Sequence, residues 1–152
     1  MPEPARRNAH SQFATIATPE NPLALTCGTV MEHLTLAYET HGTLNAECTN
    51  GILLFHALSG NQHAAGHCGQ LPEANGRWTE DCHRGWWDLF IGPGKALDTE
   101  KFFIVCANYL GGCYGTTGPA SINPASGRQY AAEFPQISTA DVVRAQGRLL
   151  DQ

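Results

Sequence analysis

The sequence predicts an α/β fold in which two buried parallel strands are joined by a long crossover connection. The first observation is a pair of continuous apolar runs, Gly51–His56 and Phe102–Ala107, which lack the polar alternation of a half-exposed strand. The second is the long stretch between them, because parallel strands need an extended crossover. The third is one amphipathic pattern late in the sequence, which predicts a helix over Ser138–Asp151.

The composition is that of a folded domain, and it argues against two classes of partner. Of the 152 residues, 42% are hydrophobic and 15% are charged, where about 25% charged residues is typical of soluble domains. The net charge of −5 argues against nucleic-acid binding, which needs a basic surface. Long uninterrupted apolar stretches are missing from the sequence, so we expect no membrane partner either.

The beginning of the sequence predicts neither a secretion signal nor an ordered element. Arg6 and Arg7 are not followed by an apolar stretch, so we expect a cytoplasmic protein. In a reducing compartment the six cysteines would be free thiols. We interpret residues 1–20 as a disordered lead and residues 21–152 as the folded part.

Before the first buried strand, the sequence predicts an antiparallel pair. Leu23–Val30 and Leu34–Thr40 are rich in strand-forming residues and meet around Glu32. In the second strand, apolar side chains alternate with small or polar ones, which is the period of a half-buried strand. That alternation places Glu39 on the face opposite the leucines.

The crossover between the buried strands is expected to be largely irregular, with helical character near Trp86–Phe90. The last helix is better defined, because Ser138 is a good N-cap and Asp141, three residues later, resembles the partner in a capping box. The helical pattern then runs to Gln152 with no terminating glycine and no following strand. The sequence therefore predicts a chain that is truncated inside its domain.

The first candidate for chemistry is the turn His56–Gly60, which directly follows a buried strand. Ligands of open α/β sheets bind at the carboxyl ends of the strands. A small, glycine-containing turn at that place can point backbone N–H groups into a cleft, as an oxyanion hole requires. A plain strand-to-loop turn is the alternative, and the pattern alone leaves both open.

Histidines and cysteines in the crossover are candidate zinc ligands, because zinc prefers these side chains. Their spacing matches no closed structural-zinc pattern, and Gly66 weakens a helix that would bring two histidines to one face. We therefore expect ordinary loop residues and no metal, with a non-enzymatic zinc-binding module as the alternative. The candidates are His63, His67, Cys68, Cys82 and His83.

Two further patterns are incomplete. The glycine-rich run Gly111–Gly118 is followed by no Gly-Lys-Ser/Thr and opens no Gly-x-Gly-x-x-Gly helix, so we expect it to line a pocket rather than bind phosphate. The Gly-x-Ser-x-Gly elbow of serine hydrolases does not occur, and no serine has the strand–turn–helix context of a nucleophile. From its own residues, the sequence contains no complete catalytic set.

Several motifs, in order along the chain, strongly resemble those of the homoserine O-acyltransferases, commonly homoserine O-acetyltransferase. The resemblance extends over residues 20–152. The motifs are Tyr38–Asn45, His56–Gly60, Gly85–Asp88, Gly92–Lys95, Asp98–Thr99, Asn108–Pro119 and Ser121–Pro124.

The resemblance implies the N-terminal part of an α/β-hydrolase fold, truncated before the nucleophile strand. It implies acyl transfer from acetyl-CoA to the side-chain hydroxyl of L-homoserine, in methionine biosynthesis, by a Ser-His-Asp ping-pong mechanism. Acyl-CoA is then a co-substrate, no cofactor is implied, and the full-length family is expected to be homodimeric. A succinyl-CoA-dependent homoserine or serine acyltransferase and an α/β-hydrolase that cleaves an ester with water are alternatives.

Carried over residue by residue, the resemblance implies that one part of the machinery lies in this chain. The backbone N–H of Leu58 would be an oxyanion-hole donor, with Ser59 and Gly60 shaping the turn. The serine, aspartate and histidine of the triad are expected beyond Gln152. The chain alone is therefore expected to be inactive, and the role of the insertion His67–Arg84 stays open.

Overall fold

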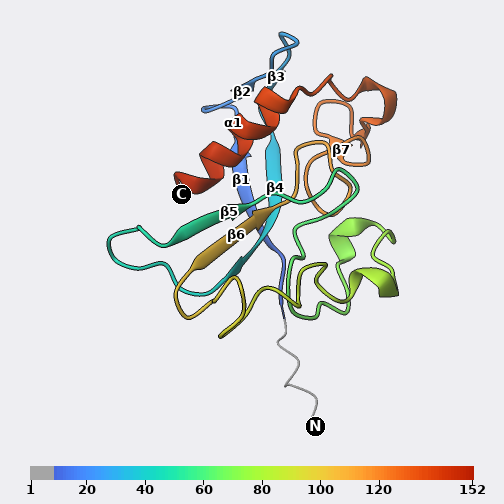
Figure 1. Cartoon of the computed structure of the whole chain (residues 1–152). Coiled ribbons are helices and arrows are strands. Elements are labelled where there is room, and N and C mark those ends of the chain that lie inside the picture. Colours follow the sequence, from blue (N-terminus) through green and yellow to red (C-terminus); the bar gives the residue numbers. More distant parts are fainter. Residues whose placement is uncertain (1–8) are drawn as a thin grey trace. The chain divides into compact units, whose positions relative to one another are not determined.

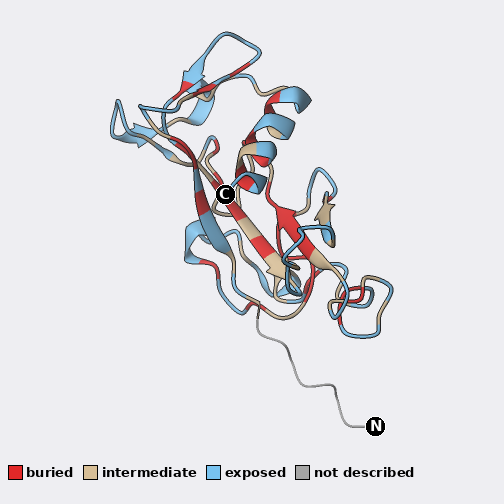
Figure 2. Cartoon of the chain, turned by 90° about the vertical axis from the view of Figure 1, so that its left-hand side faces the viewer, coloured by how far each residue is buried: buried red, intermediate tan, exposed pale blue. Residues whose placement is uncertain are grey.

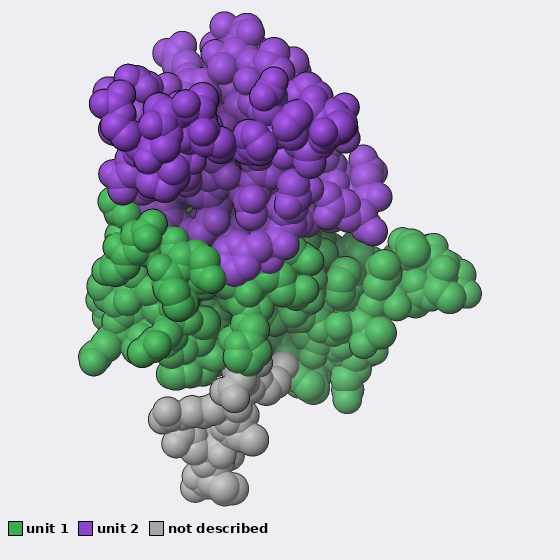
Figure 3. All heavy atoms as spheres, turned by 180° about the vertical axis from the view of Figure 1, so that it is seen from behind, with its two compact units in different colours: residues 1–12, 38–107 green, residues 13–37, 108–152 purple. Residues whose placement is uncertain are grey.

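The computed structural model describes residues 9–152, which form two compact units (Figure 3). Unit 1 contains the described residues up to Gln12 together with Tyr38–Ala107. Unit 2 contains Phe13–Ala37 and Asn108–Gln152. Strand β4 (Leu34–His41) begins in unit 2 and ends in unit 1, so each unit is built around part of this strand.

In unit 1, the second half of β4 is followed in the sheet by β6 (Phe103–Ala107) and then β5 (Gly51–Leu54). β5 and β6 run parallel, with Ile52 opposite Ile104. This confirms the parallel pairing expected of the two apolar runs. β4 runs antiparallel to β6, so the sheet is mixed.

The crossover from β5 to β6 is largely irregular, as expected. Its regular parts are two short 3-10 helices, η1 (Pro72–Ala74) and η2 (Glu80–Cys82). The stretch Trp86–Phe90 forms hydrogen-bonded turns rather than a helix. Residues of the crossover and of β6 form the buried core of unit 1, which consists of Ala64, Ala65, Ile91, Ile104 and Cys106.

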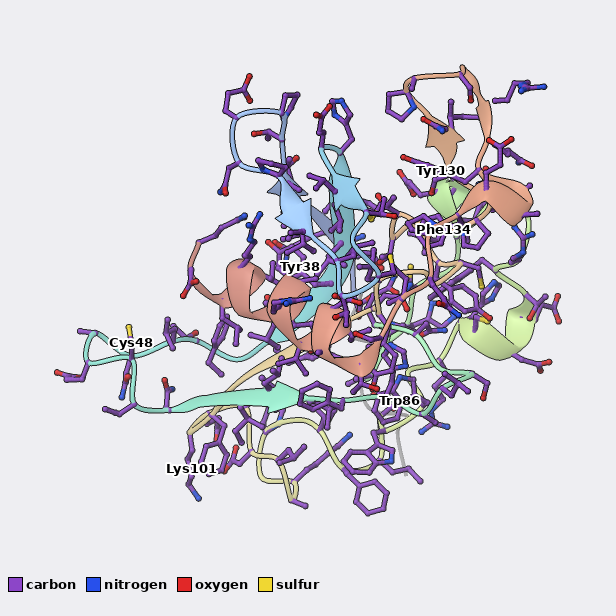
Figure 4. All side chains as sticks on the ribbon, turned by 90° about the horizontal axis from the view of Figure 1, so that it is seen from above. Tyr38, Cys48, Trp86, Lys101, Tyr130 and Phe134 are labelled. Carbon is purple, nitrogen blue, oxygen red and sulfur yellow. The ribbon has the colours of Figure 1, made fainter. Side chains whose placement is uncertain are left out.

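The loop between β4 and β5 projects from the sheet, with Cys48 near its tip (Figures 1 and 4). Asn50 fixes the end of this loop, because its Nδ2 donates to the carbonyls of Thr43 at 2.9 Å and Lys101 at 3.1 Å. Gly42 starts the loop with φ at +88°, and a Cβ there would lie 2.1 Å from the carbonyl oxygen of Phe102. Only glycine fits this position without rearrangement.

In unit 2, β1 (Gln12–Ala17) is hydrogen-bonded to β4. This strand lies within the stretch 1–20 that the sequence analysis interprets as a disordered lead. Residues 1–8 of that stretch lie outside the described residues. The strand buries Ala14, Ile16 and Ala17, an alternation too short to stand out in the sequence.

The predicted pairing of Leu23–Val30 with Leu34–Thr40 is wrong. The chain turns back earlier, so that β2 (Leu23–Ala24) pairs antiparallel with β3 (Val30–Met31). The Leu25 N–H donates to the Thr29 carbonyl at 2.8 Å across this turn. A second small hairpin, β7 (Ile122–Asn123) with β8 (Arg128–Gln129), lies in the same unit.

Helix α1 (Thr139–Leu150) follows the 3-10 helix η3 (Ala131–Glu133) and begins with the predicted capping box. The Ser138 hydroxyl accepts from the Asp141 N–H, and the Asp141 carboxylate accepts from the Ser138 N–H at 2.8 Å. Figure 2 shows buried and exposed residues alternating around this helix. None of the helices in residues 9–152 has the length and apolar character needed to cross a membrane.

Candidate oxyanion loop

The turn singled out in the sequence directly follows β5 in unit 1. Its first residue, His56, is buried, whereas the next three are exposed, and Leu58 at the tip is 95% exposed. The Gly60 N–H donates to the Ala57 carbonyl at 2.7 Å and closes the turn. The turn therefore presents the backbone around Leu58 at the surface of the unit.

The carbonyl of Ala57 and the N–H of Leu58 belong to one planar peptide unit. That carbonyl accepts from Gly60 and also lies 2.7 Å from Nδ1 of His56. Because a carbonyl can only accept, Nδ1 of His56 carries the hydrogen in this contact. Two hydrogen bonds on one side of the peptide thus fix its plane, and the Leu58 N–H points the opposite way.

The Leu58 N–H itself is available. No group within residues 9–152 accepts a hydrogen bond from it. A preorganised N–H donor without an internal partner is what an oxyanion hole requires. Ser59 lies beside it and is exposed, so the structure places Leu58, Ser59 and Gly60 together in one turn.

Gly60 is the residue that makes this turn possible. A Cβ at this position would lie 3.0 Å from Cβ of His56 and 3.1 Å from both the Ala57 carbonyl oxygen and His56 Nδ1. These are the atoms that hold the peptide between Ala57 and Leu58. A side chain at Gly60 would therefore press on the group that orients the N–H.

Three consecutive polar residues, Asn61, Gln62 and His63, follow the turn and are all buried. The indole Nε1–H of Trp86, labelled in Figure 4, donates to the Asn61 carbonyl at 3.0 Å. The His63 N–H donates to Oδ1 of Asn61 at 2.9 Å. The chain is therefore anchored immediately after the exposed tip.

His63 forms a buried pair with Glu39, and each side chain is 1% exposed. Nδ1 of His63 lies 2.9 Å from Oε2 of Glu39. The hydroxyl of Ser11 donates to Oε1 of the same carboxylate at 2.9 Å. Serine, histidine and carboxylate are the types found in a catalytic triad, but the order is wrong: Ser11 contacts the acid and not the imidazole, so it is not activated as a nucleophile.

The histidines and cysteines proposed as zinc ligands do not converge. Nδ1 of His63 is hydrogen-bonded to Glu39, and Sγ of Cys68 donates to the Gln70 carbonyl at 3.3 Å. The rings of His67 and His83 meet edge-on with centroids 5.7 Å apart. Across residues 9–152 no group of three or more histidine, cysteine, aspartate or glutamate side chains is arranged to hold a metal ion.

Neither the buried Cys106 thiol nor a serine of the described residues is activated as a nucleophile. Burial raises the pKa of the Cys106 thiol to about 12, with a smaller contribution from the charge of Glu39. That thiol is protonated at neutral pH and is a poor nucleophile. No serine hydroxyl among residues 9–152 is hydrogen-bonded to a histidine.

The glycine-rich run Gly111–Gly118 has a structural role in unit 2. The Thr116 hydroxyl accepts from the Ala37 N–H at 3.0 Å, and the Thr117 hydroxyl accepts from the Thr35 N–H at 2.9 Å. These threonines satisfy backbone donors of β4. The prediction that this run lines a pocket did not include this role, because the threonines' partners lie 79 and 82 positions away in the sequence.

A cavity of about 350 Å³ lies in unit 1, near the start of the β4–β5 loop. It is lined by Glu39, Thr40, His41 and Gly66, among others. The turn residues Ala57–Gly60 are not part of this lining. The cavity is therefore not the place where Leu58 would meet a carbonyl oxygen.

Known proteins with similar sequences include homoserine acyltransferases. The chain is 52% identical over 136 residues to a homoserine O-succinyltransferase of Halorhodospira halophila. It is 54% identical over 129 residues to a homoserine O-acetyltransferase of Moorella thermoacetica. These matches cover 90% and 85% of this chain but only 33% and 32% of the relatives, so the chain spans about a third of their length. No family profile matches the sequence.

Solved structures with the same fold include a homoserine O-acetyltransferase and an esterase. The homoserine O-acetyltransferase from Bacillus anthracis matches 95% of this chain with a TM-score of 0.76 and 35% identity. Esterase E22 matches with a TM-score of 0.78 and 31% identity. In both cases the match covers 37% of the solved chain.

Proposed function

This chain belongs to the homoserine O-acyltransferase family, as the N-terminal part of an α/β-hydrolase fold, and on that premise we propose that the complete protein transfers an acyl group from acyl-CoA to the side-chain hydroxyl of L-homoserine. The relatives include both acetyl- and succinyltransferases, so the proposal names the acyl-CoA class and not one donor. We place the reaction in methionine biosynthesis in the cytoplasm, carried out by a homodimer without a bound cofactor.

The proposed mechanism has two acyl transfers. A serine outside these 152 residues attacks the thioester carbonyl, the C–S bond breaks, and the thiol of CoA leaves with the proton that a histidine took from the serine. The hydroxyl of homoserine then attacks the acyl-enzyme, giving its proton to the histidine and forming the new ester. The serine recovers that proton as it leaves. Negative charge develops on the carbonyl oxygen in both transfers.

The observation that carries the proposal is the fixed peptide between Ala57 and Leu58. Its carbonyl accepts two hydrogen bonds, Leu58 is exposed, and the N–H has no acceptor within residues 9–152. We propose that this N–H donates to the developing oxyanion, while Ser59 and Gly60 shape the turn. An oxyanion-hole donor of this kind contributes about 10²–10³-fold to kcat.

Hydrolysis of an ester by water is a second candidate, supported by the structural match to esterase E22. The same oxyanion donor would serve either acceptor, since both reactions pass through a tetrahedral intermediate. The two functions differ in what attacks the acyl-enzyme. An assay with and without homoserine separates them.

The test uses the complete protein with acetyl-CoA and succinyl-CoA, and it measures both free thiol and acylated homoserine. We expect thiol release that depends on homoserine and matches the ester formed. Thiol release that is equal without homoserine would show a hydrolase instead. The 152-residue chain alone should release no thiol above a control without protein, and measurable transfer by it would contradict the proposed location of the triad.

The role of Leu58 is tested by a pair of substitutions. Leu58→Pro removes the N–H, whereas Leu58→Ala keeps it and shortens an exposed side chain. We expect kcat of the proline variant to lie about 10²-fold or more below that of the alanine variant, with similar melting temperatures. Equal kcat values for the two variants would exclude this N–H as the donor.

A further inference from the structure

The three residues that follow the turn are of a type seldom buried in succession. Asn61, Gln62 and His63 are polar and buried in succession. Burying polar groups costs free energy unless each is hydrogen-bonded. Apolar side chains would fill the same space at lower cost, so the hydrogen bonds of these residues need an explanation beyond packing.

The hydrogen bonds form a ring that starts and ends in the loop. Nε2 of Gln62 donates to the Ser11 hydroxyl at 2.8 Å, and that hydroxyl donates to Oε1 of Glu39 at 2.9 Å. Nδ1 of His63 lies 2.9 Å from Oε2 of the same carboxylate. Two neighbouring loop residues are thus held by the two oxygens of one carboxylate on β4, and all members lie in unit 1.

The imidazole of His63 has a partner at each ring nitrogen. Its Nε2 lies 3.2 Å from the His83 carbonyl, which can only accept and also receives the Cys68 N–H at 2.9 Å. Nδ1 faces the carboxylate of Glu39. Both ring nitrogens of His63 therefore face oxygen atoms of other residues, which hold the imidazole from two sides.

A buried polar contact of this kind is seldom a source of net stability, because desolvation of the two groups offsets their attraction. What it supplies is a fixed geometry, since each buried polar group needs well-aligned hydrogen-bond partners. The ring restrains Gln62 and His63 through their side chains. Trp86 restrains Asn61 through its carbonyl, so the loop is held directly behind the Leu58 turn.

We propose that Glu39 is a positioning residue that fixes the loop carrying the Leu58 N–H, acting through His63 on one side and through Ser11 and Gln62 on the other. This inference rests on the proposed function, because it takes Leu58 as the oxyanion donor. Glu39 touches no substrate in this scheme. Its effect is to hold the N–H within the narrow tolerance that transition-state stabilisation demands.

The test compares Glu39→Gln with Asp141→Asn in the complete protein. Both substitutions remove one buried carboxylate, but Asp141 lies in unit 2, where its partners are Thr26, Ser138 and Arg144. Rates are divided by the number of active sites, measured from the burst of thiol release. We expect Glu39→Gln to lower kcat per active site about 10–100-fold with KM for acyl-CoA within about twofold, because a misplaced oxyanion donor weakens only the transition state. Asp141→Asn should leave kcat per active site unchanged.

Amide hydrogen exchange gives a readout that does not depend on activity. Glu39→Gln should speed exchange of the amides in residues 57–63 at least tenfold more than Asp141→Asn does. If neither variant transfers acyl groups because the wild type does not, the proposed function fails while the exchange result still decides the role of Glu39. Equal exchange in the two variants, or equal kcat per active site, would overturn the inference.

A milder variant covers the case in which Glu39→Gln does not fold. Ser11→Ala removes the connection from Glu39 to Gln62 and keeps the contact between His63 and Glu39. It should lower kcat per active site by a smaller factor, about 3–10-fold, and speed exchange at Gln62. Wild-type values for both quantities would contradict the proposal.

Discussion

The carboxylate of Asp141 accepts hydrogen bonds from both the backbone N–H and the hydroxyl of Thr26, at 2.9 and 3.0 Å, although 115 positions separate the two residues. Asp141 also belongs to the capping box of α1 and pairs with Arg144. The same side chain thus caps the helix locally and also contacts a residue that is distant in the sequence. The first turn of α1 is fastened to the turn between β2 and β3 by one buried side chain.

Asp141→Asn should therefore destabilise the fold by about 1–3 kcal/mol, because buried donors lose a charged acceptor. Burial alone would raise the pKa of Asp141, but the hydrogen bonds from Ser138, Thr26 and Arg144 outweigh it and lower the pKa. The ionised form hence stabilises the fold above the unfolded-state value of about 3.9, and this stabilisation is lost as the pH falls. Thermal unfolding at several pH values measures both effects.

The control for that measurement is Asp81→Asn, since Asp81 is an exposed aspartate. The wild-type protein and the control should lose melting temperature between about pH 5 and pH 3 more steeply than Asp141→Asn does. Parallel pH profiles for all three proteins would contradict the assignment.

Gly42→Ala should be far more damaging than Gly28→Ala. Both glycines have positive φ, +88° and +90°, so both substitutions carry the same backbone strain of about 1–2 kcal/mol. Only at Gly42 would the new Cβ meet backbone, 2.1 Å from the Phe102 carbonyl oxygen. We expect the Gly42 variant to lose at least about 3 kcal/mol or fail to fold, as chemical denaturation would show. Equal losses in the free energy of unfolding would mean that the loop rearranges around the new Cβ with little strain.

Thiol labelling should separate two cysteines. Hydrogen bonds from the side chain and then the backbone of Thr29 lower the pKa of exposed Cys27, whereas burial raises the pKa of Cys106 to about 12. Cys27 therefore has more thiolate at neutral pH and should react first with iodoacetamide, with Cys106 reacting only on unfolding. Peptide mass spectrometry follows each site.

Thr29→Ala supplies the matched test for Cys27. Losing the side-chain hydrogen bond should slow labelling of Cys27 several-fold and leave the exposed Cys48 unaffected. A rate at Cys27 that does not respond to this substitution would show that exposure alone governs its reactivity.

Within residues 9–152, β5 has a hydrogen-bonded neighbour on one side only. Ile52 and Leu54 pack on the core, so Leu53 lies on the other face of this edge strand. Unprotected apolar edges pair with other chains, and we expect the 152-residue chain to aggregate. Leu53→Lys should reduce light scattering of the refolded chain. Val143→Lys, which adds the same charge on α1, should not, and an equal benefit from it would point to net charge as the cause.

The parts of the fold that could be predicted are those with a local signal. The apolar runs of β5 and β6 and the capping box of Ser138 lie in short stretches of sequence, and the structure confirms both. The partner of Leu34–Thr40 could not be obtained this way. β4 pairs with β6, more distant along the chain than the neighbouring strand, and partner choice depends on how the whole core packs.

In the candidate site, too, only the part with a local sequence signal could be predicted. The turn around Leu58 has a local pattern, a buried strand followed by small residues and glycine. The ring beneath it has none, because alternation along β4 indicates that Glu39 faces away from the buried side, whereas the structure buries it. A carboxylate is buried only where partners from other segments meet it, and Ser11 and His63 come from two of them.

The division into units also sets an order of assembly. Each unit combines an early stretch with a later one, and in unit 2 the contact from Arg148 to the Ile16 carbonyl joins positions 132 apart. Tyr38–Ala107 is continuous and can collapse as soon as it leaves the ribosome. β1 is made early, yet it must wait for α1 to be synthesised before its contacts are complete. A chaperone that holds nascent chains would therefore find the α1-facing contacts of the first strand unmade until the helix has been synthesised.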